Sequence, residues 1–148
     1  MLGETRYIKM QKLFYNYRAS KSAYCQNERI DAVVGSYQEH NEWEDYDNYL
    51  MSYVDESYKN KVALDFACGP ARNIIKYRDR FLRIDGADIS EVNIKNAIEN
   101  IHQFGMDTPN LYVTSGNDCG NIEDSSYDMI FSTIAMQHIC VYEIRFQI

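Results

Sequence analysis

Between residues 62 and 132, short apolar runs alternate with longer stretches of helical periodicity. The apolar runs predict strands at residues 62–66, 84–88, 111–114 and 129–132, and the stretches between them predict helices at 72–80 and 91–103. Strand, helix and strand in this order form right-handed units on a parallel sheet. The alternation therefore predicts an α/β fold in which helices flank a parallel sheet.

The N-terminal part of the chain has a different character. Leu13, Phe14 and Tyr17 follow a helical stripe, and a second helix is predicted from Asn41 to about Asp55. Residues 1–60 are therefore expected to form a helical N-terminal cap, and residues 61–148 the sheet domain. With 148 residues the chain is long enough to bury a core of its own.

Composition excludes several classes of partner. A net charge of −7 argues against nucleic acid, and no apolar run approaches the ~18 residues of a membrane span, so neither nucleic acid nor membrane is expected as a partner. The N-terminus has no signal-peptide core. The cysteines have no metal-binding or disulfide spacing, which predicts a cytoplasmic protein without a metal: Cys25, Cys68, Cys119 and Cys140.

An acid ends or follows each of the first three predicted strands: Asp65, Asp88 and Asp118. The carboxyl ends of parallel strands meet at one edge of a sheet, where such sheets bind ligands. Asp88 follows Asp65 by 23 residues and is placed to accept two hydrogen bonds from a ribose diol. Asp118 is placed to accept from an exocyclic amine, because a carboxylate only accepts. The three acids predict a nucleoside pocket.

Four segments in order resemble those of class I S-adenosylmethionine-dependent methyltransferases. They are D-F-A-C-G-P-A at 65–71, G-A-D-I-S at 86–90, S-G-N-D-C at 115–119 and Y-D-M-I-F-S-T-I-A-M-Q-H-I at 127–139. The resemblance runs from about Asn41 to the end. It implies a Rossmann-like sheet with strand order 3-2-1-4 that lacks the last three strands of the family fold. It also implies S-adenosylmethionine as cofactor and an unidentified, small-molecule methyl acceptor.

The family pattern assigns roles to individual positions. Asp65 and Gly69 would lie against the methionine moiety, and Asp88 would hold the ribose hydroxyls. The backbone near Ser132 and Thr133 would help to hold the methionine amino group. The complete set of cofactor-contacting residues that the resemblance implies is Asp65, Ala67, Cys68, Gly69, Asn73, Asp88, Ile89, Asn117, Asp118, Cys119, Ser132 and Thr133.

Each assignment has a structural alternative. Asp65 can cap the loop, and Asp88 and Asp118 can be turn acids. Cys68 and Cys119 are expected to pack rather than react. His138 is the histidine nearest to the site, either as a proton acceptor or as part of a helix start. No catalytic residue can be assigned, which suits methyl transfer because positioning supplies much of its catalysis.

The loop departs from the family pattern at two positions. Ala67 and Ala71 stand where the family has glycine, and each costs about 1–2 kcal/mol if its φ is positive.

Three functions remain open. The first is a methyltransferase or the N-terminal part of one, and the second is a truncated, noncatalytic cofactor-binding or oligomerising module. The third is a nicotinamide-dependent oxidoreductase domain, against which the absence of G-x-G-x-x-G argues. The fourth strand is expected at an exposed sheet edge, which predicts a homo-oligomer formed through that strand.

Overall fold

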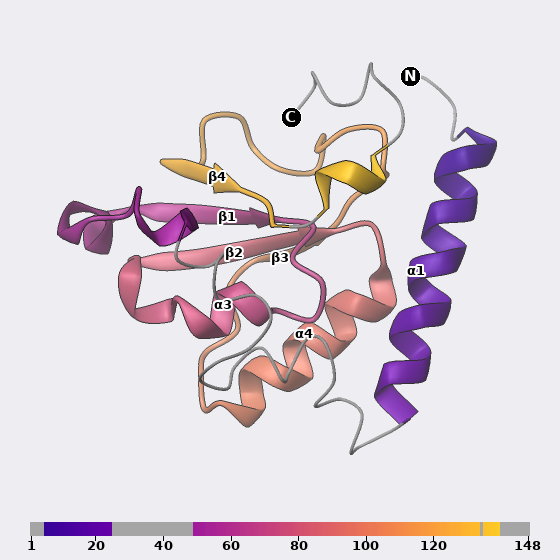
Figure 1. The fold of residues 1–148 in the computed structure, drawn as a ribbon, viewed down its shortest axis with the longest axis horizontal. Helices are drawn as coiled ribbons and strands as arrows, with labels where there is room; N and C mark the ends of the chain where they lie inside the picture. Colours follow the sequence, from indigo (N-terminus) through magenta and orange to yellow (C-terminus); the bar gives the residue numbers. More distant parts are fainter. Residues whose placement is uncertain (1–4, 25–48, 134, 140–148) are drawn as a thin grey trace.

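A computed structural model describes residues 5–24, 49–133 and 135–139 of the chain (Figure 1). Three α-helices have assigned bounds: α1 (Arg6–Tyr24), α3 (Arg72–Lys76) and α4 (Glu91–Gln103). The strands are β1 (Val62–Phe66), β2 (Arg83–Asp88), β3 (Leu111–Val113) and β4 (Met129–Phe131). Short 3₁₀ helices lie at Glu56–Asn60, Arg78–Arg80 and Met136–His138.

The four strands form one parallel sheet in the order β3-β2-β1-β4. This order confirms the predicted 3-2-1-4 arrangement and the Rossmann-like fold. In the register, Asp65 of β1 pairs with Gly86 of β2 and Phe131 of β4, and Asp88 of β2 pairs with Val113 of β3. Because all strands are parallel, their carboxyl ends gather at a single edge of the sheet.

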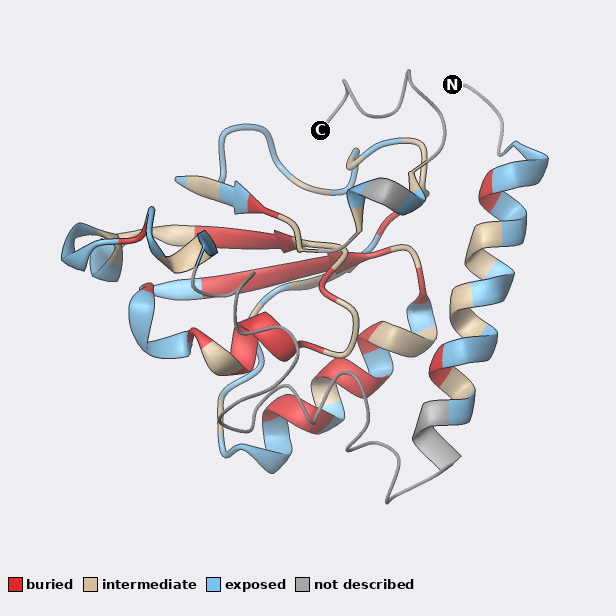
Figure 2. Cartoon of the chain, in the orientation of Figure 1, coloured by how far each residue is buried: buried red, intermediate tan, exposed pale blue. Residues whose placement is uncertain are grey.

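Helices α3 and α4 cover one face of the sheet (Figure 1). The buried apolar side chains of this face and of the two helices form the core, and Figure 2 colours the buried segments of β1, β2, α3 and α4 red. Its members include Ala63, Ile74, Ile75, Ile84, Ile94, Ala97, Ile101 and Phe131. Burying one such aliphatic side chain contributes about 1.5–3 kcal/mol, so this layer fixes the sheet beneath the loop that follows β1.

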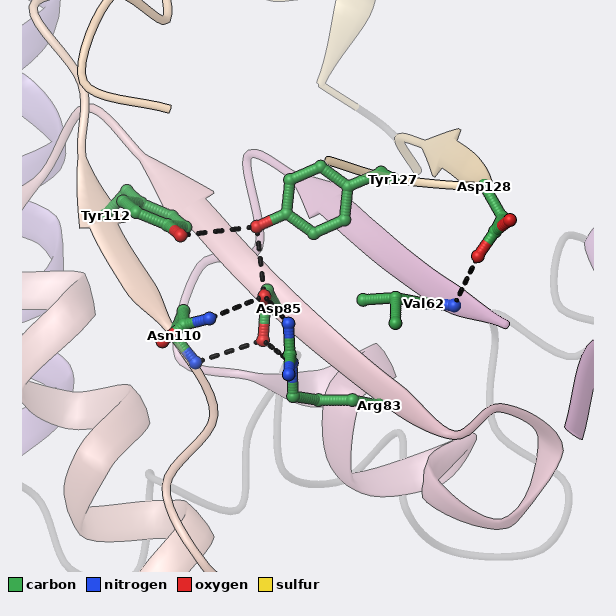
Figure 3. Close-up of polar contacts among 7 residues, drawn as sticks. All are labelled: Val62, Arg83, Asp85, Asn110, Tyr112, Tyr127 and Asp128. Carbon is green, nitrogen blue, oxygen red and sulfur yellow. Dashed lines mark hydrogen bonds and ion pairs between the residues drawn. The ribbon is translucent and has the colours of Figure 1, made fainter. Parts of the chain in front are cut away.

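The opposite face carries a buried acid that the sequence did not reveal. Asp85 of β2 has no exposed surface, yet its carboxylate accepts five hydrogen bonds (Figure 3). Arg83 donates two at 2.8 and 3.1 Å, and Asn110 donates its backbone N–H and its amide, each at 3.0 Å. The Tyr127 hydroxyl donates the fifth at 2.9 Å. Asp85 therefore ties the starts of β3 and β4 to β2.

Helix α1 stands beside the carboxyl ends of the strands and packs on α4 (Figure 1). Its polar contacts on this side include two side-chain hydrogen bonds: the Ser90 hydroxyl donates to Asn16 Oδ1 at 2.7 Å, and the Asn96 amide donates to the Ala19 carbonyl at 3.1 Å. Ile8 is buried on the same inward face. Within the predicted cap at residues 1–60, α1 is therefore helical. It lies next to the sheet edge at which a ligand is predicted to bind.

The predicted element bounds agree with the structure to within a few residues, with two informative differences. The helix predicted at 72–80 ends at Lys76 and gives way to a 3₁₀ turn, so that the Leu82 N–H reaches the Lys61 carbonyl at 2.9 Å. In α4, Val92, whose helical spacing predicts that it faces the sheet, is half-buried, whereas Ile94 is one of the buried positions. The sequence also predicts an N-cap at Ser90, and the structure confirms it, because the Ser90 hydroxyl accepts the Asn93 N–H at 3.1 Å.

Two expectations fall largely on residues that the structure does not describe. Of the helix predicted at 41–55, only residues 49–51 are described as helical, and residues 41–48 lie outside the described part. The sequence also predicts a helix start at 141–148, and these residues lie outside the described part. The division into a cap at 1–60 and a sheet domain at 61–148 stays a prediction for the same reason.

Candidate functional site

The loop between β1 and α3 is built from left-handed backbone. Ala67, Gly69 and Ala71 have φ values of 62°, 54° and 74°. The loop also folds back onto β2, because the Cys68 N–H donates to the Ala87 carbonyl at 3.0 Å. Alternating left-handed residues expose backbone N–H groups to one side, which is how small-residue loops approach ligands closely. The two alanines therefore occupy positions whose geometry favours glycine.

Replacing Ala67 by glycine is expected to raise the free energy of unfolding by about 0.5–1 kcal/mol. Relief of left-handed strain contributes about 1–2 kcal/mol, and the added flexibility of the unfolded chain takes back part of it. Ala71→Gly is expected to be near neutral, because Ala71 is fully buried and its methyl group is lost from the core. Urea denaturation followed by circular dichroism measures both changes.

Ala97→Gly is the control for this pair. Ala97 is also fully buried, but it lies within α4 rather than at a left-handed position. Glycine there is expected to lower stability by about 1 kcal/mol or more. Equal destabilisation by Ala67→Gly and Ala97→Gly would show that the loop is not strained at Ala67.

Asp65, near the end of β1, lies in a buried polar cluster in which some acceptor atoms have no hydrogen-bond donor. Its Oδ2 accepts from the Asn73 amide at 3.2 Å, and that amide also donates to Thr133 Oγ1 at 2.9 Å. In this cluster, Asp65 Oδ1 and Asn73 Oδ1 are buried without a hydrogen-bond partner among the described residues, and so is Oγ of Ser132, the residue before Thr133. Buried polar atoms are normally paired, so this cluster is suited to a ligand that donates hydrogen bonds.

The ionisation of Asp65 reflects this environment. Burial raises the pKa of Asp65 to about 7, which the Asn73 hydrogen bond and the Arg72 charge only partly offset. The nearby Asp88 carboxylate adds to the rise. A cation placed beside Asp65 would favour its charged form and lower this pKa again.

Asp88, at the end of β2, holds the loop in place. Its Oδ2 accepts the Gly69 N–H at 2.9 Å, and its Oδ1 accepts the Ser90 N–H at 2.8 Å. Burial raises the pKa of Asp88, and these two backbone N–H groups partly offset the rise. The structure therefore brings Asp65, Asp88 and the β1–α3 loop together at one edge of the sheet.

The segments after β2 and β3 are placed differently. Ile89 is half-buried, and a Cβ on Gly116 would lie only 2.6 Å from Ile89 Cδ1, so the absence of a side chain at Gly116 admits Ile89. Asn117 and Asp118 form a turn in which Ser115 Oγ accepts both backbone N–H groups at 3.1 and 3.2 Å. The Asp118 carboxylate is exposed and accepts from Ser115 and Gly120, so it serves the local turn.

The two described cysteines lie in different surroundings. Cys68 is buried in the loop, where burial raises the pKa of its thiol well above the ordinary value, which disfavours a reactive thiolate. Cys119 is half-buried and lines a cavity of about 200 Å³ together with Leu64, Phe66 and Ile130. Side chains of β1 alternate between faces, so this cavity lies on the opposite face from Asp65. The structure thus separates Cys119 from the Asp65 cluster.

His138 contacts α1 through its backbone and its ring. Its carbonyl accepts from the Tyr7 hydroxyl at 3.1 Å and from the Gln11 amide, and its ring packs edge-on against Tyr15. These contacts give His138 a structural role in joining the segment after β4 to α1. Among the described residues, no group of side chains is arranged to hold a metal ion.

Arg72 is a site residue that the sequence analysis missed. Its side chain is buried, and its guanidinium donates to Thr133 Oγ1 at 3.1 Å, beside the Asn73 amide that donates to the same atom. The sequence offered one signal for this role, which is that a charged residue directly follows the loop, at the start of the helix predicted at 72–80. Only the fold shows that Arg72 and Thr133 meet.

The comparisons with known proteins agree with this geometry. A family model described as a methyltransferase domain matches residues 63–146. No curated protein sequence matches the chain at a significant level. The similar solved structures share only 13–16% identity in the three cases below, so they bear on the fold alone.

Magnesium protoporphyrin IX methyltransferase from Synechocystis, solved with its bound cofactor SAM, is similar over 93% of this chain and 66% of its own, with 14% identity and a TM-score of 0.62. Geranyl diphosphate C-methyltransferase from Streptomyces coelicolor is similar over 90% and 56%, with 13% identity and a TM-score of 0.64.

An S-adenosylmethionine-dependent methyltransferase from Clostridium acetobutylicum is similar over 79% of this chain and 44% of its own chain, with 16% identity and a TM-score of 0.53. The chain therefore spans between about four tenths and two thirds of the length of these three structures. The family model matches more than half of the chain, and the sheet order and the strand-end acids fit it. The chain belongs to the class I methyltransferase family.

Proposed function

We propose that the chain binds S-adenosylmethionine at the carboxyl ends of β1 and β2 and takes part in methyl transfer to a small-molecule acceptor. The observation that supports this most is the Asp65 cluster, in which Asp65 Oδ1, Asn73 Oδ1 and Ser132 Oγ are buried and unpartnered. The methionine end of the cofactor carries an ammonium group, which is positively charged and can donate three hydrogen bonds. The donor-seeking cluster therefore fits this end of the cofactor.

The remaining contacts follow from the same edge of the sheet. Asp88 is the acid for the ribose hydroxyls, while it continues to hold the Gly69 N–H. Ile89 offers an apolar surface to the adenine, and Asn117 and Asp118 are proposed for the adenine edge. The sulfonium supplies an activated methyl group for in-line displacement, so the chain's task is to orient the cofactor and exclude water.

Calorimetric titration of the folded chain tests the cofactor. Heat is expected with S-adenosylmethionine and with S-adenosylhomocysteine, and none with NAD. For an Asp65→Asn variant of the site, Asp107→Asn is a suitable control. Asp107 is exposed, and its substitution also removes one carboxylate but away from the site. Folded protein that gives no heat with either sulfur nucleoside would reject the proposed function.

Activity needs a separate test, because binding alone also suits a noncatalytic module. Labelled methyl transfer to metabolite pools is expected with the wild-type chain and is expected to be lost in Asp88→Ala. Equal product from both proteins would remove Asp88 from the site. Binding without product in any pool would favour the noncatalytic module.

Binding of S-adenosylhomocysteine is expected to weaken at acidic pH. Asp65 has a pKa of about 7 without ligand, and its ammonium-binding form is the carboxylate. Below pH 7 the ligand must displace a proton, so affinity falls as pH falls, by roughly tenfold between pH 8 and pH 6. Calorimetry at several pH values, in buffers of different ionisation enthalpy, measures the affinity and the protons released. An affinity that is flat across this range would contradict the assignment of Asp65.

We further propose that the chain forms homo-oligomers through β4. Within the described residues β4 pairs only with β1, and Ile130 at its centre is 54% exposed. An edge strand with unpaired backbone and an apolar side chain favours pairing with a second chain. Ile130→Lys is expected to convert the oligomer to a monomer in light scattering at tens of micromolar. Leu82→Lys, at an exposed site outside the strands, is expected to leave the oligomer intact.

We propose a reducing, cytoplasmic location, because the described cysteines form no disulfide bond. Cys68 and Cys119 are both free thiols. None of the described helices is long and apolar enough to cross a membrane.

A further inference from the structure

The charge of the chain is unevenly distributed, and α1 is where it departs most from the average. The helix carries five basic residues and no acidic one: Arg6, Lys9, Lys12, Arg18 and Lys21. The rest of the chain has ten basic and 22 acidic residues. The net charge of −7, which argued against a nucleic-acid partner, therefore includes a strongly cationic element.

The outward face of α1 is apolar along its centre. Met10, Leu13, Phe14 and Tyr17 are 58%, 56%, 55% and 61% exposed. Their spacing of three, one and three residues puts them on one side of the helix, and we call these four residues the α1 stripe. Each of the four side chains keeps more than half of its surface exposed.

Four of the five cations border the stripe, whereas Lys12 lies on the inward side of the helix. By helical geometry, Lys9 and Arg18 flank it on its two sides, and Arg6 and Lys21 lie near its two ends. The Lys21 ammonium lies 5.4 Å from the centroid of the Tyr17 ring. Exposed apolar side chains beside long cationic ones can contact an anionic membrane surface, where the apolar groups meet the acyl boundary and the cations meet the headgroups.

We propose that the α1 stripe docks the protein on an anionic lipid surface. Met10 and Leu13 are aliphatic, so their burial needs an apolar medium, which lipid provides and a nucleic-acid backbone does not. Arg6, Lys9 and Lys21 complement anionic headgroups, and α1 itself contains no acidic residue. The inward face of the helix is occupied separately, by Ile8 and by the contacts of Asn16 and Ala19 with α4. Docking therefore requires no change in the fold.

The position of α1 gives this docking a consequence. The helix borders the carboxyl ends of the strands and contacts the His138 carbonyl through Tyr7. A protein held by the α1 stripe would have the Asp65 edge of its sheet close to the lipid headgroups. The inference does not depend on what that edge binds.

Vesicle flotation with the full chain tests the proposal. Binding is expected to vesicles of phosphatidylcholine with phosphatidylglycerol, and to fall sharply for phosphatidylcholine alone or at about 0.5 M salt. The double variant Lys9→Gln with Lys21→Gln is expected to bind about 25-fold more weakly, at about fivefold for each cation. Leu13→Ser with Phe14→Ser is expected to abolish flotation.

Matched controls lie near the amino ends of the strands, away from α1. Lys59→Gln with Arg80→Gln removes two exposed charges there, and Leu82→Ser removes an exposed apolar side chain. Both are expected to float as the wild type does. Circular dichroism of each variant shows that it is folded.

Three results would overturn the proposal. One is folded wild-type protein that fails to float with the anionic vesicles at low salt. Another is equal loss of binding in the controls and in the α1 variants. The third is a vesicle-free oligomer in light scattering that Leu13→Ser with Phe14→Ser dissociates, because the stripe would then be covered by a second copy of the chain.

Discussion

Asp85→Ala is expected to lower the free energy of unfolding by about 3 kcal/mol. The substitution removes the common acceptor of five hydrogen bonds (Figure 3). The Arg83 side chain is about half exposed and can be solvated again, so most of the loss comes from Asn110 and Tyr127. Breaking a buried, fully paired charge costs about 3–5 kcal/mol, and we take the lower end for this reason.

Asp128→Ala is the matched control, because Asp128 is a second carboxylate beside the same sheet and has fewer hydrogen bonds (Figure 3). Asp128 is exposed and its carboxylate accepts one hydrogen bond, from the Val62 N–H at 2.8 Å. Its loss is expected to cost about 0.5–1.5 kcal/mol. Urea denaturation of both variants gives the comparison. A change of less than 1 kcal/mol in Asp85→Ala would mean that Asp85 does not fix β3 and β4 to β2.

The difference between Asp85 and Asp65 explains what the sequence could and could not predict. Both acids lie within apolar strands, and periodicity locates both strands. Asp65 ends its strand, where a ligand-binding edge is expected, so its position alone suggested a role. Asp85 lies mid-strand, and its partners at Asn110 and Tyr127 come from distant parts of the chain. No local pattern predicts that these three side chains meet.

The strand order was predictable for a different reason. Each strand is short and apolar, each intervening segment has a helical period or a turn signal, and right-handed crossovers leave few ways to arrange them. The family resemblance then selected the order that the sheet has. The Ser90 cap and the stop at Gly105, whose φ is +67°, follow from local signals, a hydroxyl before the helix and a glycine after it.

Helix α1 shows the limit of reading amphipathicity from sequence. Leu13, Phe14 and Tyr17 form a stripe that indicated a helix correctly, but the stripe is exposed. The inward face is instead marked by Ile8, Asn16 and Ala19, a small and partly polar set. Periodicity locates a helix, whereas the choice of buried face depends on which partner surface is present. Polar partners on α4 decide it for α1.

The predicted site residues divide in the same way. Asp65, Asn73, Asp88 and Thr133 converge because they follow strand ends or begin the next helix, which are positions that topology fixes. Cys119 belongs to a longer connection between β3 and β4, whose path no periodicity defines. It lines the cavity on the other face of the sheet. Sequence spacing is therefore a good guide at strand ends and a poor one inside long connections.

Asp65→Asn is expected to weaken cofactor binding and to stabilise the protein without ligand, two changes of opposite sign. The folded-state pKa of Asp65, about 7, lies above the ordinary value of 3.8, so the folded chain holds a proton that the unfolded chain releases between these pH values. Stability conferred by this group is present at acidic pH and is lost as pH rises towards 7. At pH 8 the buried carboxylate costs about 2–4 kcal/mol, and asparagine does not ionise.

The variant is therefore expected to be more stable than the wild type at pH 8 by about 2–4 kcal/mol and to equal it near pH 4. Denaturation of both proteins across this range measures the difference directly. Binding of S-adenosylhomocysteine at pH 8 is expected to weaken by roughly 100-fold, because a charged hydrogen bond to the ammonium is worth about 1.5–3 kcal/mol. A purely structural Asp65 would give the stability change and leave affinity unchanged. Loss of both stability and affinity would instead mean that the carboxylate supports the fold, and that its unpartnered oxygen is not reserved for a ligand.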